Sequence, residues 1–240
     1  MEQFQPGSPA TEPGFLGSIR EALRGSQQDF TKIPLRRAIT LLAIPMVLEM
    51  AGESLFAICD AFFVARLGSG PLATVGLTES LLFLVYVVAI GLSLATTAIV
   101  ARRIGEKDHR GAAEAAVQAI ALGILIALIL GSVSAFAAPH LLRLMGATEE
   151  VISVGLGYTR WMFGGMLTIV LFFLINAAFR GAGDASSAMR ALWFANVINL
   201  ILDPCLIFGL GPFPELGLTG AAVATNIGRG CGVLYQVSIL

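Results

Sequence analysis

Residues 41–68 read LLAIPMVLEMAGESLFAICDAFFVARLG, an apolar run that nevertheless carries three carboxylates. An α-helix rises about 1.5 Å per residue, so about 20 apolar residues cross the hydrocarbon core of a bilayer. An acid at mid-depth costs about 2.5 to 3.5 kcal/mol, so it needs a partner or a role. The run therefore predicts a membrane-spanning helix with one polar face.

The acids of this run, Glu49, Glu53 and Asp60, follow a helical spacing. At about 100° per residue they lie within about 40° of one another, as one stripe that faces away from lipid. Intramembrane carboxylates usually mark an ion or substrate path, which is the interpretation we favour. A polar seam that only joins helices is the alternative. Pro45 predicts a kink in the same helix and is a candidate hinge.

The composition is that of an integral membrane protein. The chain is 56% apolar and 13% charged, with a mean hydropathy of +0.83. Soluble domains are less apolar and more charged. Cys59, Cys205 and Cys231 lie in apolar segments without metal-site spacing, so we expect them to pack as small apolar residues. We expect no nucleic-acid partner.

Turn signals divide the chain into a flexible cytoplasmic leader, residues 1–33, and an all-α, six-helix transmembrane bundle, residues 34–240. Phe15, Leu16, Ile19 and Leu23 predict a short amphipathic helix in the leader. No cleavable signal peptide is expected. The six expected spans are 38–66, 72–101, 112–138, 151–179, 191–210 and 218–240.

Basic residues indicate the orientation in the membrane. They gather in the leader and in the connectors 102–110 and 180–190, whereas the alternate connectors hold little beyond Arg66 and Arg143. By the positive-inside rule, the N-terminus is cytoplasmic. We expect a multi-pass protein of the cell inner (plasma) membrane.

A second polar stripe lies in the expected span 191–210. Asn196, Asn199 and Asp203 share a helix face, and Pro204 leaves a carbonyl without its helical partner one turn earlier. Amides beside a carboxylate can hold a proton or Na⁺. The alternative is an interhelix hydrogen-bond clamp.

Five motifs occur in order: CDAFFVARLG, IGLSLATTAIVARRIGEKD, FRGAGDASSAM, NLILDPCLIFG and GLTGAAVAT. From residue 34 to residue 240 the chain resembles the N-terminal lobe of the multidrug and toxic compound extrusion (MATE) transporters, of the DinF-like prokaryotic type. The resemblance implies a twelve-helix fold made of two six-helix lobes. The chain ends inside its sixth expected span, so we expect a fragment whose partner is the missing C-terminal lobe; a dimerising half-transporter is the alternative.

The resemblance also implies a site. The cation- or proton-coupling residues would be Asp60, Asn176, Asn199, Asp203 and Thr225, with Thr219 as the fallback threonine. Na⁺ at Asp60 and Asp203 would be the only metal ion, and no other cofactor is expected. We expect the cavity to be lined by Glu49, Glu53, Glu79 and Asn196. The expected hinges are Pro45 and Pro204.

The expected function is secondary active antiport. A lipophilic, drug-like cation or toxic metabolite would leave the cell across the lipid bilayer in exchange for H⁺ or Na⁺, and an acidic cavity would favour such cations. A lipid-linked oligosaccharide flippase of similar architecture is the first alternative. Residues 181–184 also match the GxGD string of intramembrane aspartyl proteases, but Asp184 stands in a loop and is better explained by turn chemistry. We therefore do not expect an enzyme.

Overall fold

The structure is a computed structural model that describes residues 15–24 and 33–240. Within these ranges it is all-helical and contains no strand, which confirms the expected all-α fold. Most of the leader lies outside the described residues, although one helix falls within it. The helices are α1 (Phe15–Arg24), α2 (Leu35–Ala65), α3 (Ser69–Gly105), α4 (His109–Leu144), α5 (Glu149–Gly164), α6 (Met166–Gly181), α7 (Ala185–Phe208) and α8 (Leu218–Ile239).

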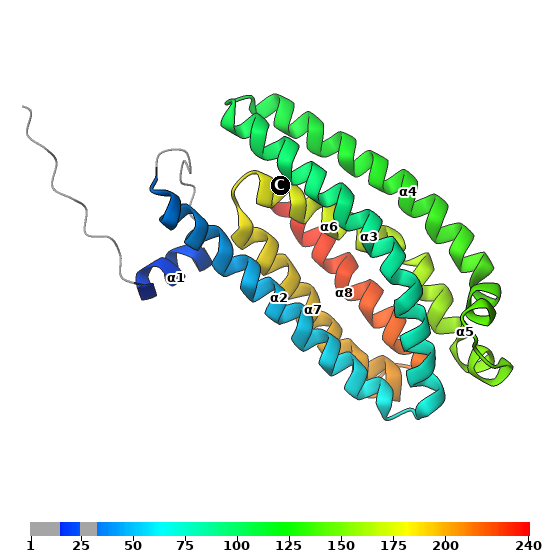
Figure 1. Ribbon diagram of the computed structural model, residues 1–240. Coiled ribbons are helices and arrows are strands. Elements are labelled where there is room, and N and C mark those ends of the chain that lie inside the picture. Colours follow the sequence, from blue (N-terminus) through cyan, green and yellow to red (C-terminus); the bar gives the residue numbers. More distant parts are fainter. Residues whose placement is uncertain (1–14, 25–32) are drawn as a thin grey trace, which may run out of the picture.

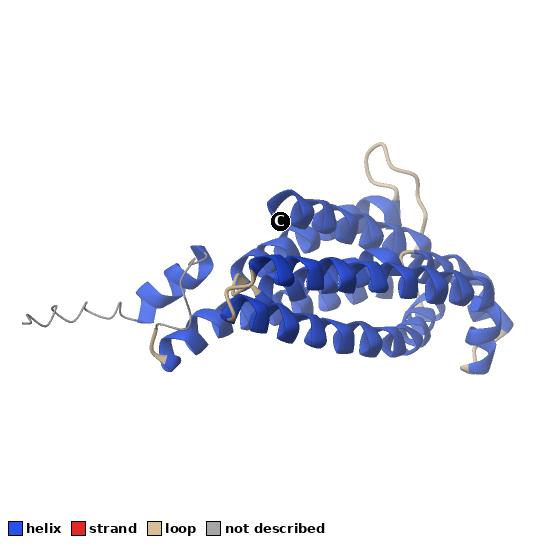
Figure 2. Cartoon of the chain, turned by 90° about the horizontal axis from the view of Figure 1, so that it is seen from above, coloured by secondary structure: helices blue, strands red, loops and turns tan. Residues whose placement is uncertain are grey.

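Helix α8 is the centre of the bundle and packs against α5, α6 and α7 (Figure 1). Helix α2 packs along α7, while α3 packs against α4, α5 and α6. Viewed from above, the helices run side by side and are joined by loops (Figure 2). Helix α2 makes few contacts with α3 and α8, and a cavity separates part of it from α6.

The outer faces of α2, α3 and α4 carry many exposed large apolar side chains, such as Ile58, Leu94 and Phe136. An apolar surface of this extent suits lipid rather than water. Helices α2, α3, α4 and α7 are long and apolar enough to cross a membrane, and α5 with α6 makes a fifth such span.

Helix α8 is the sixth expected span, and it does not meet that apolar criterion. The polar side of the helix packs against α5, α6 and α7, so its polar residues need not face lipid. Polar residues such as Arg229 and the fully buried Gln236 can therefore occur on it.

The expected continuous span 151–179 is two helices, α5 and α6, which meet at Gly165 with a bend of 40°. The Asn226 side chain occupies the space that a Cβ on Gly165 would need. Its Nδ2 donates to the Trp161 carbonyl at 2.8 Å, beside the Gly165 N–H. The Asn226 side chain thus packs into the bend between α5 and α6 while the Gly165 N–H keeps its helical bond to Trp161.

Several helices extend beyond the apolar runs that predict them. Helix α3 continues through Arg102 and Arg103 to Gly105, and α4 continues through Pro139 to Leu144. The turn before α3 needs a glycine, because Gly68 has φ of 113°. Neither Pro45 nor Pro204 ends its helix, so a hinge at either position stays a prediction.

Glycines let α8 approach α7 closely. A Cβ on Gly220 would meet the backbone of Leu206 and Ile207, and a Cβ on Gly228 would lie 2.8 Å from the Ala195 carbonyl oxygen. Small residues at helix contacts are typical of membrane bundles. This close approach brings the polar residues of α7 within reach of those of α8.

Candidate functional site

Asp203, Asn199 and Thr225 form one hydrogen-bonded group at the α7–α8 contact. With the Asn199 amide nitrogen turned to the carboxylate, Nδ2 donates to Asp203 Oδ2 at 2.7 Å. The Asn199 oxygen then accepts from the Thr225 hydroxyl at 3.1 Å and from the Thr225 backbone N–H at 2.9 Å. Asn199 and Asp203 stand one turn apart on α7, so the helix itself presents them together.

Asp60 of α2 faces this group, and its carboxylate interacts electrostatically with that of Asp203. Asp203 is fully buried. Among the described residues, Oδ1 of Asp60 and Oδ1 of Asp203 have no hydrogen-bond partner. A buried carboxylate that lacks a partner is costly unless it takes up a proton or a cation. We call Asp60, Asn199, Asp203 and Thr225 the carboxylate cluster.

Asn196, which we expected to line the cavity, and Thr219, the fallback threonine, lie outside this cluster. Asn196 faces α2 instead, and its Nδ2 donates to the Gly52 carbonyl at 3.2 Å. Thr219 lies against Gly157 of α5. Thr225 is thus the threonine that the structure places beside Asn199.

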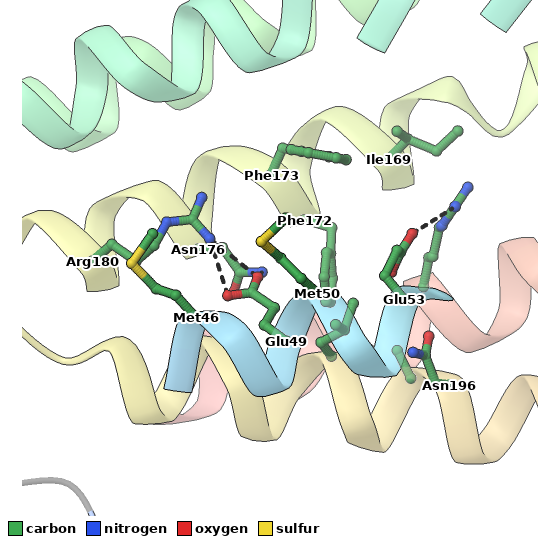
Figure 3. Close-up of a pocket in the computed structure, with 13 residues that line it drawn as sticks. Met46, Glu49, Met50, Glu53, Ile169, Phe172, Phe173, Asn176, Arg180 and Asn196 are labelled. Atoms are coloured by element: carbon green, nitrogen blue, oxygen red, sulfur yellow. Dashed lines mark hydrogen bonds and ion pairs between the residues drawn. The ribbon is translucent and has the colours of Figure 1, made fainter. Parts of the chain in front are cut away.

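A cavity of about 240 Å³ lies in the space between α2 and α6, with α7 and α8 below it (Figure 3). Its walls are largely apolar and aromatic, from Met46, Met50, Ile169, Phe172 and Phe173. Its polar lining comprises Glu49, Glu53, Asn176, Arg180, Asn196 and Arg229. Two carboxylates therefore face two guanidinium groups, so the lining is less acidic than the sequence suggests.

Glu49 and Arg180 form an ion pair across one end of the cavity, as Figure 3 shows. Arg180 Nη1 lies 3.1 Å and 3.3 Å from the two carboxylate oxygens of Glu49. The Glu49 side chain is 16% exposed and the Arg180 side chain 20%. Asn176 Nδ2 also donates to Glu49 at 3.2 Å, and Asn176 accepts from Gln236 Nε2 at 2.6 Å. Asn176 thus belongs to this group and makes no hydrogen bond to the carboxylate cluster within the described residues.

This ion pair should connect α2 to α6 energetically. In the full-length protein, Glu49→Ala and Arg180→Ala should each lower the thermal unfolding midpoint, and the double variant should lower it by less than the sum. We expect a coupling of about 0.5 to 3 kcal/mol, as for other contacting residues. Glu114→Ala and Arg110→Ala are the control, because that pair on α4 is exposed and should show almost no coupling. Additive effects for Glu49 and Arg180 would contradict the role of the pair.

Arg229 occupies the opposite end of the cavity. Its Nη2 lies 4.0 Å from Glu53 and 3.5 Å from the Tyr86 hydroxyl. Glu79 of α3, which the sequence also suggested as lining, interacts electrostatically with Arg229 from outside the cavity wall. Glu49, Glu53 and Asp60 therefore share one stripe of α2, but Glu49 pairs with Arg180 whereas Glu53 and Asp60 both interact with Arg229.

Sequence reasoning missed the roles of Arg180 and Gln236, and it suggested an acidic partner for Arg229 without identifying Glu53 as that partner. The sequence placed Arg180 in a connector, but in the structure it lies in the last turn of α6. A charged residue within an apolar span indicates a functional role, and this rule applies to Arg229 as it does to the acids. The partner of each charge depends on the helix packing and is not visible in the sequence.

Asp184 has a structural role. It is the N-cap of α7: its carboxylate accepts from the Ser187 N–H at 3.1 Å and from the Ser186 hydroxyl at 2.8 Å. A capping carboxylate satisfies backbone donors of the first turn. The GxGD string is therefore explained by helix capping. Separately, the described residues contain no group of three or more His, Cys, Asp or Glu side chains that could hold a metal ion.

Comparison with known proteins adds independent findings. A family model described as MatE matches residues 45–205. A protein of Shewanella oneidensis named FAD transporter is 30% identical over 192 residues, which are 80% of this chain and 42% of that protein. A protein of Thermotoga maritima named probable multidrug resistance protein NorM is 29% identical over 205 residues, which are 85% of this chain and 44% of that protein.

A solved structure is also similar over most of the chain. It is that of a transporter of the MOP superfamily from Pyrococcus furiosus, whose title states that the reverse polarity of its binding pocket suggests a different function. The TM-score is 0.78 at 32% identity, and the match covers 92% of this chain and 46% of that one. The chain thus spans less than half the length of these relatives.

Proposed function

The chain belongs to the MatE family, as its motifs suggested, and on this premise we propose that it is the N-terminal part of a secondary active antiporter. The complete protein would export lipophilic cations or toxic metabolites across the inner membrane in exchange for H⁺ or Na⁺. Its second half would be the C-terminal lobe, and its N-terminus would be cytoplasmic.

One observation carries the proposal. Fully buried Asp203 and half-buried Asp60 each keep one buried carboxylate oxygen without a partner among the described residues, and they lie in the same bundle as a cavity with apolar, aromatic walls. The carboxylates suit a proton or Na⁺, and the walls suit a lipophilic substrate. An ion that occupies the cluster would remove the repulsion between Asp60 and Asp203 and so change how α2 packs on α7.

The driving force is sufficient for such an exchange. One elementary charge that moves across 100 mV releases about 2.3 kcal/mol. The apolar walls contribute to substrate binding in either state, whereas only the carboxylate cluster responds to the ion. Exchange therefore needs a connection between the cluster and the cavity.

Efflux of a fluorescent cation tests the proposal. The full-length transporter is expressed in cells that lack their own efflux pumps, and ethidium release is followed after energisation. Release should be faster than in vector-only cells, and an ionophore that collapses the H⁺ or Na⁺ gradient should abolish the difference. Release equal to that of vector-only cells would contradict drug export.

An anionic cargo is the second candidate, because Arg180 and Arg229 line the cavity and the Shewanella relative is named FAD transporter. In the same cells, gradient-dependent release of FAD with unchanged ethidium release would favour this candidate. The Shewanella relative is named FAD transporter and the Thermotoga relative probable multidrug resistance protein, and neither name supports a lipid flippase.

A further inference from the structure

Arg229 is a cavity residue that also interacts electrostatically with Asp60 of the carboxylate cluster. Its side chain is only 16% exposed, and it lines the cavity from α8. Its Nη1 is buried and has no hydrogen-bond partner among the described residues. Its contacts are long: 4.0 Å to Glu53 on the cavity side and 3.5 Å to the Tyr86 hydroxyl (Figure 3 shows the Glu53 pair). Within the described residues, the guanidinium thus forms no ion pair shorter than 4.0 Å.

Three carboxylates compete for this one guanidinium. Glu53 and Asp60 of α2 and Glu79 of α3 all interact with Arg229 electrostatically. The other titratable groups that face it are Tyr86 of α3 and Tyr158 of α5. One cation cannot form a close pair with all three acids. Its position therefore depends on which of them is neutralised.

The acids have different neighbours. Glu53 lines the cavity and is 49% exposed, whereas Asp60 interacts with Asp203 in the carboxylate cluster. Arg229 consequently has a substrate-side partner, Glu53, and an ion-side partner, Asp60. Arginine carries five N–H donors on a long side chain and keeps its charge throughout, so it can change partners without changing its protonation.

We propose that Arg229 couples the two sites by exchanging partners, so that a cationic substrate at Glu53 and a coupling ion at Asp60 exclude each other. This inference rests on the proposed antiport. An ion on Asp60 removes that acid's attraction for Arg229, which then pairs with Glu53 and blocks the substrate cation. A cation on Glu53 displaces Arg229 toward Asp60 and Glu79, which expels the ion. Such coupling is reciprocal, because each ligand weakens the other by the same factor.

The experiment measures binding of tetraphenylphosphonium, a lipophilic cation, to the purified full-length transporter. The dissociation constant is determined at pH 8 without Na⁺, at pH 5.5, and at pH 8 with Na⁺. For the unchanged protein, H⁺ or Na⁺ should raise the dissociation constant by about fivefold or more, in the usual range of coupled sites. Arg229→Gln should bind the cation more tightly at pH 8 without Na⁺, and the ion should then change its dissociation constant by less than about twofold.

Two further variants serve as controls. Arg229→Lys keeps the charge and should keep the ion dependence. Arg160→Gln removes an arginine of α5 that lies outside the cavity between α2 and α6, and should leave all dissociation constants unchanged. If Arg229→Gln does not fold, Glu53→Gln replaces it: this variant should bind the cation more weakly and should also lose the ion dependence.

The outcomes separate this inference from the proposed function. Ion-dependent cation binding that persists unchanged in Arg229→Gln, or in Glu53→Gln, would overturn the role of Arg229 and leave the antiport intact. Cation binding by the unchanged protein that ignores both H⁺ and Na⁺ would overturn both. Loss of the dependence in Arg229→Gln with retention in Arg229→Lys supports the inference.

Discussion

Replacing Asp203 with asparagine in the full-length transporter should reduce gradient-driven ethidium efflux by about tenfold or more, within the range of known site couplings. The substitution keeps the size of the side chain, and its amide oxygen can still accept from Asn199. It removes the only charge on the α7 side of the carboxylate cluster. An amide takes up no proton at physiological pH and is a weaker Na⁺ ligand than a carboxylate. Binding of the cation should persist while its dependence on the ion is lost.

Asp108→Asn is the matched control for this experiment. Asp108 caps helix α4 by accepting from the Gly111 N–H at 2.9 Å, far along the chain from the cluster. Asparagine caps helices about as well as aspartate, so efflux should stay unchanged. Normal coupled efflux in the Asp203→Asn variant, at equal expression in the membrane, would refute the assignment of the carboxylate cluster.

Replacing Gly220 with alanine should destabilise the bundle most among the α8 glycine variants. The added methyl group would meet the Leu206 carbonyl and would lie 2.9 Å from the Ile207 nitrogen. This backbone cannot yield easily, because the Leu216 and Gly217 N–H groups donate to the carbonyls of Leu206 and Ile207. Overpacking of this kind costs about 1 to 3 kcal/mol. The thermal unfolding midpoint of the full-length protein should fall accordingly.

Gly230→Ala tests whether the effect comes from the close contact. It is the same change on the same helix, but among the described residues outside α8 its new Cβ would approach only Thr168 Cγ2, at 4.0 Å. Alanine is the better helix former by about 1 kcal/mol, so this variant should be as stable as the original or slightly more stable. Equal losses in both variants would show that α8 tolerates no side chain for reasons other than its contact with α7.

The carboxylate cluster shows how far local spacing reaches. Asn199 and Asp203 are one helical turn apart, so their side chains meet through the geometry of a single helix, and the sequence was sufficient to pair them. Asn196 lies about one helical turn before Asn199, yet its amide donates a hydrogen bond to the Gly52 carbonyl of α2 instead. One face of α7 contacts both α2 and α8. Only the packing of the helices decides which residue of that face meets which neighbour.

The same distinction applies to the whole protein. Apolar length and the order of the motifs are properties of the chain itself, and they determined the membrane class, the helical fold and the family. The partners of Glu49, Asn176 and Arg229 depend on the central position of α8 and on the bend at Gly165, against which the Asn226 side chain packs. Those features arise from contacts between residues far apart in the chain. Periodicity gives the direction of a side chain around its own helix, but only the tertiary structure decides which charge faces it.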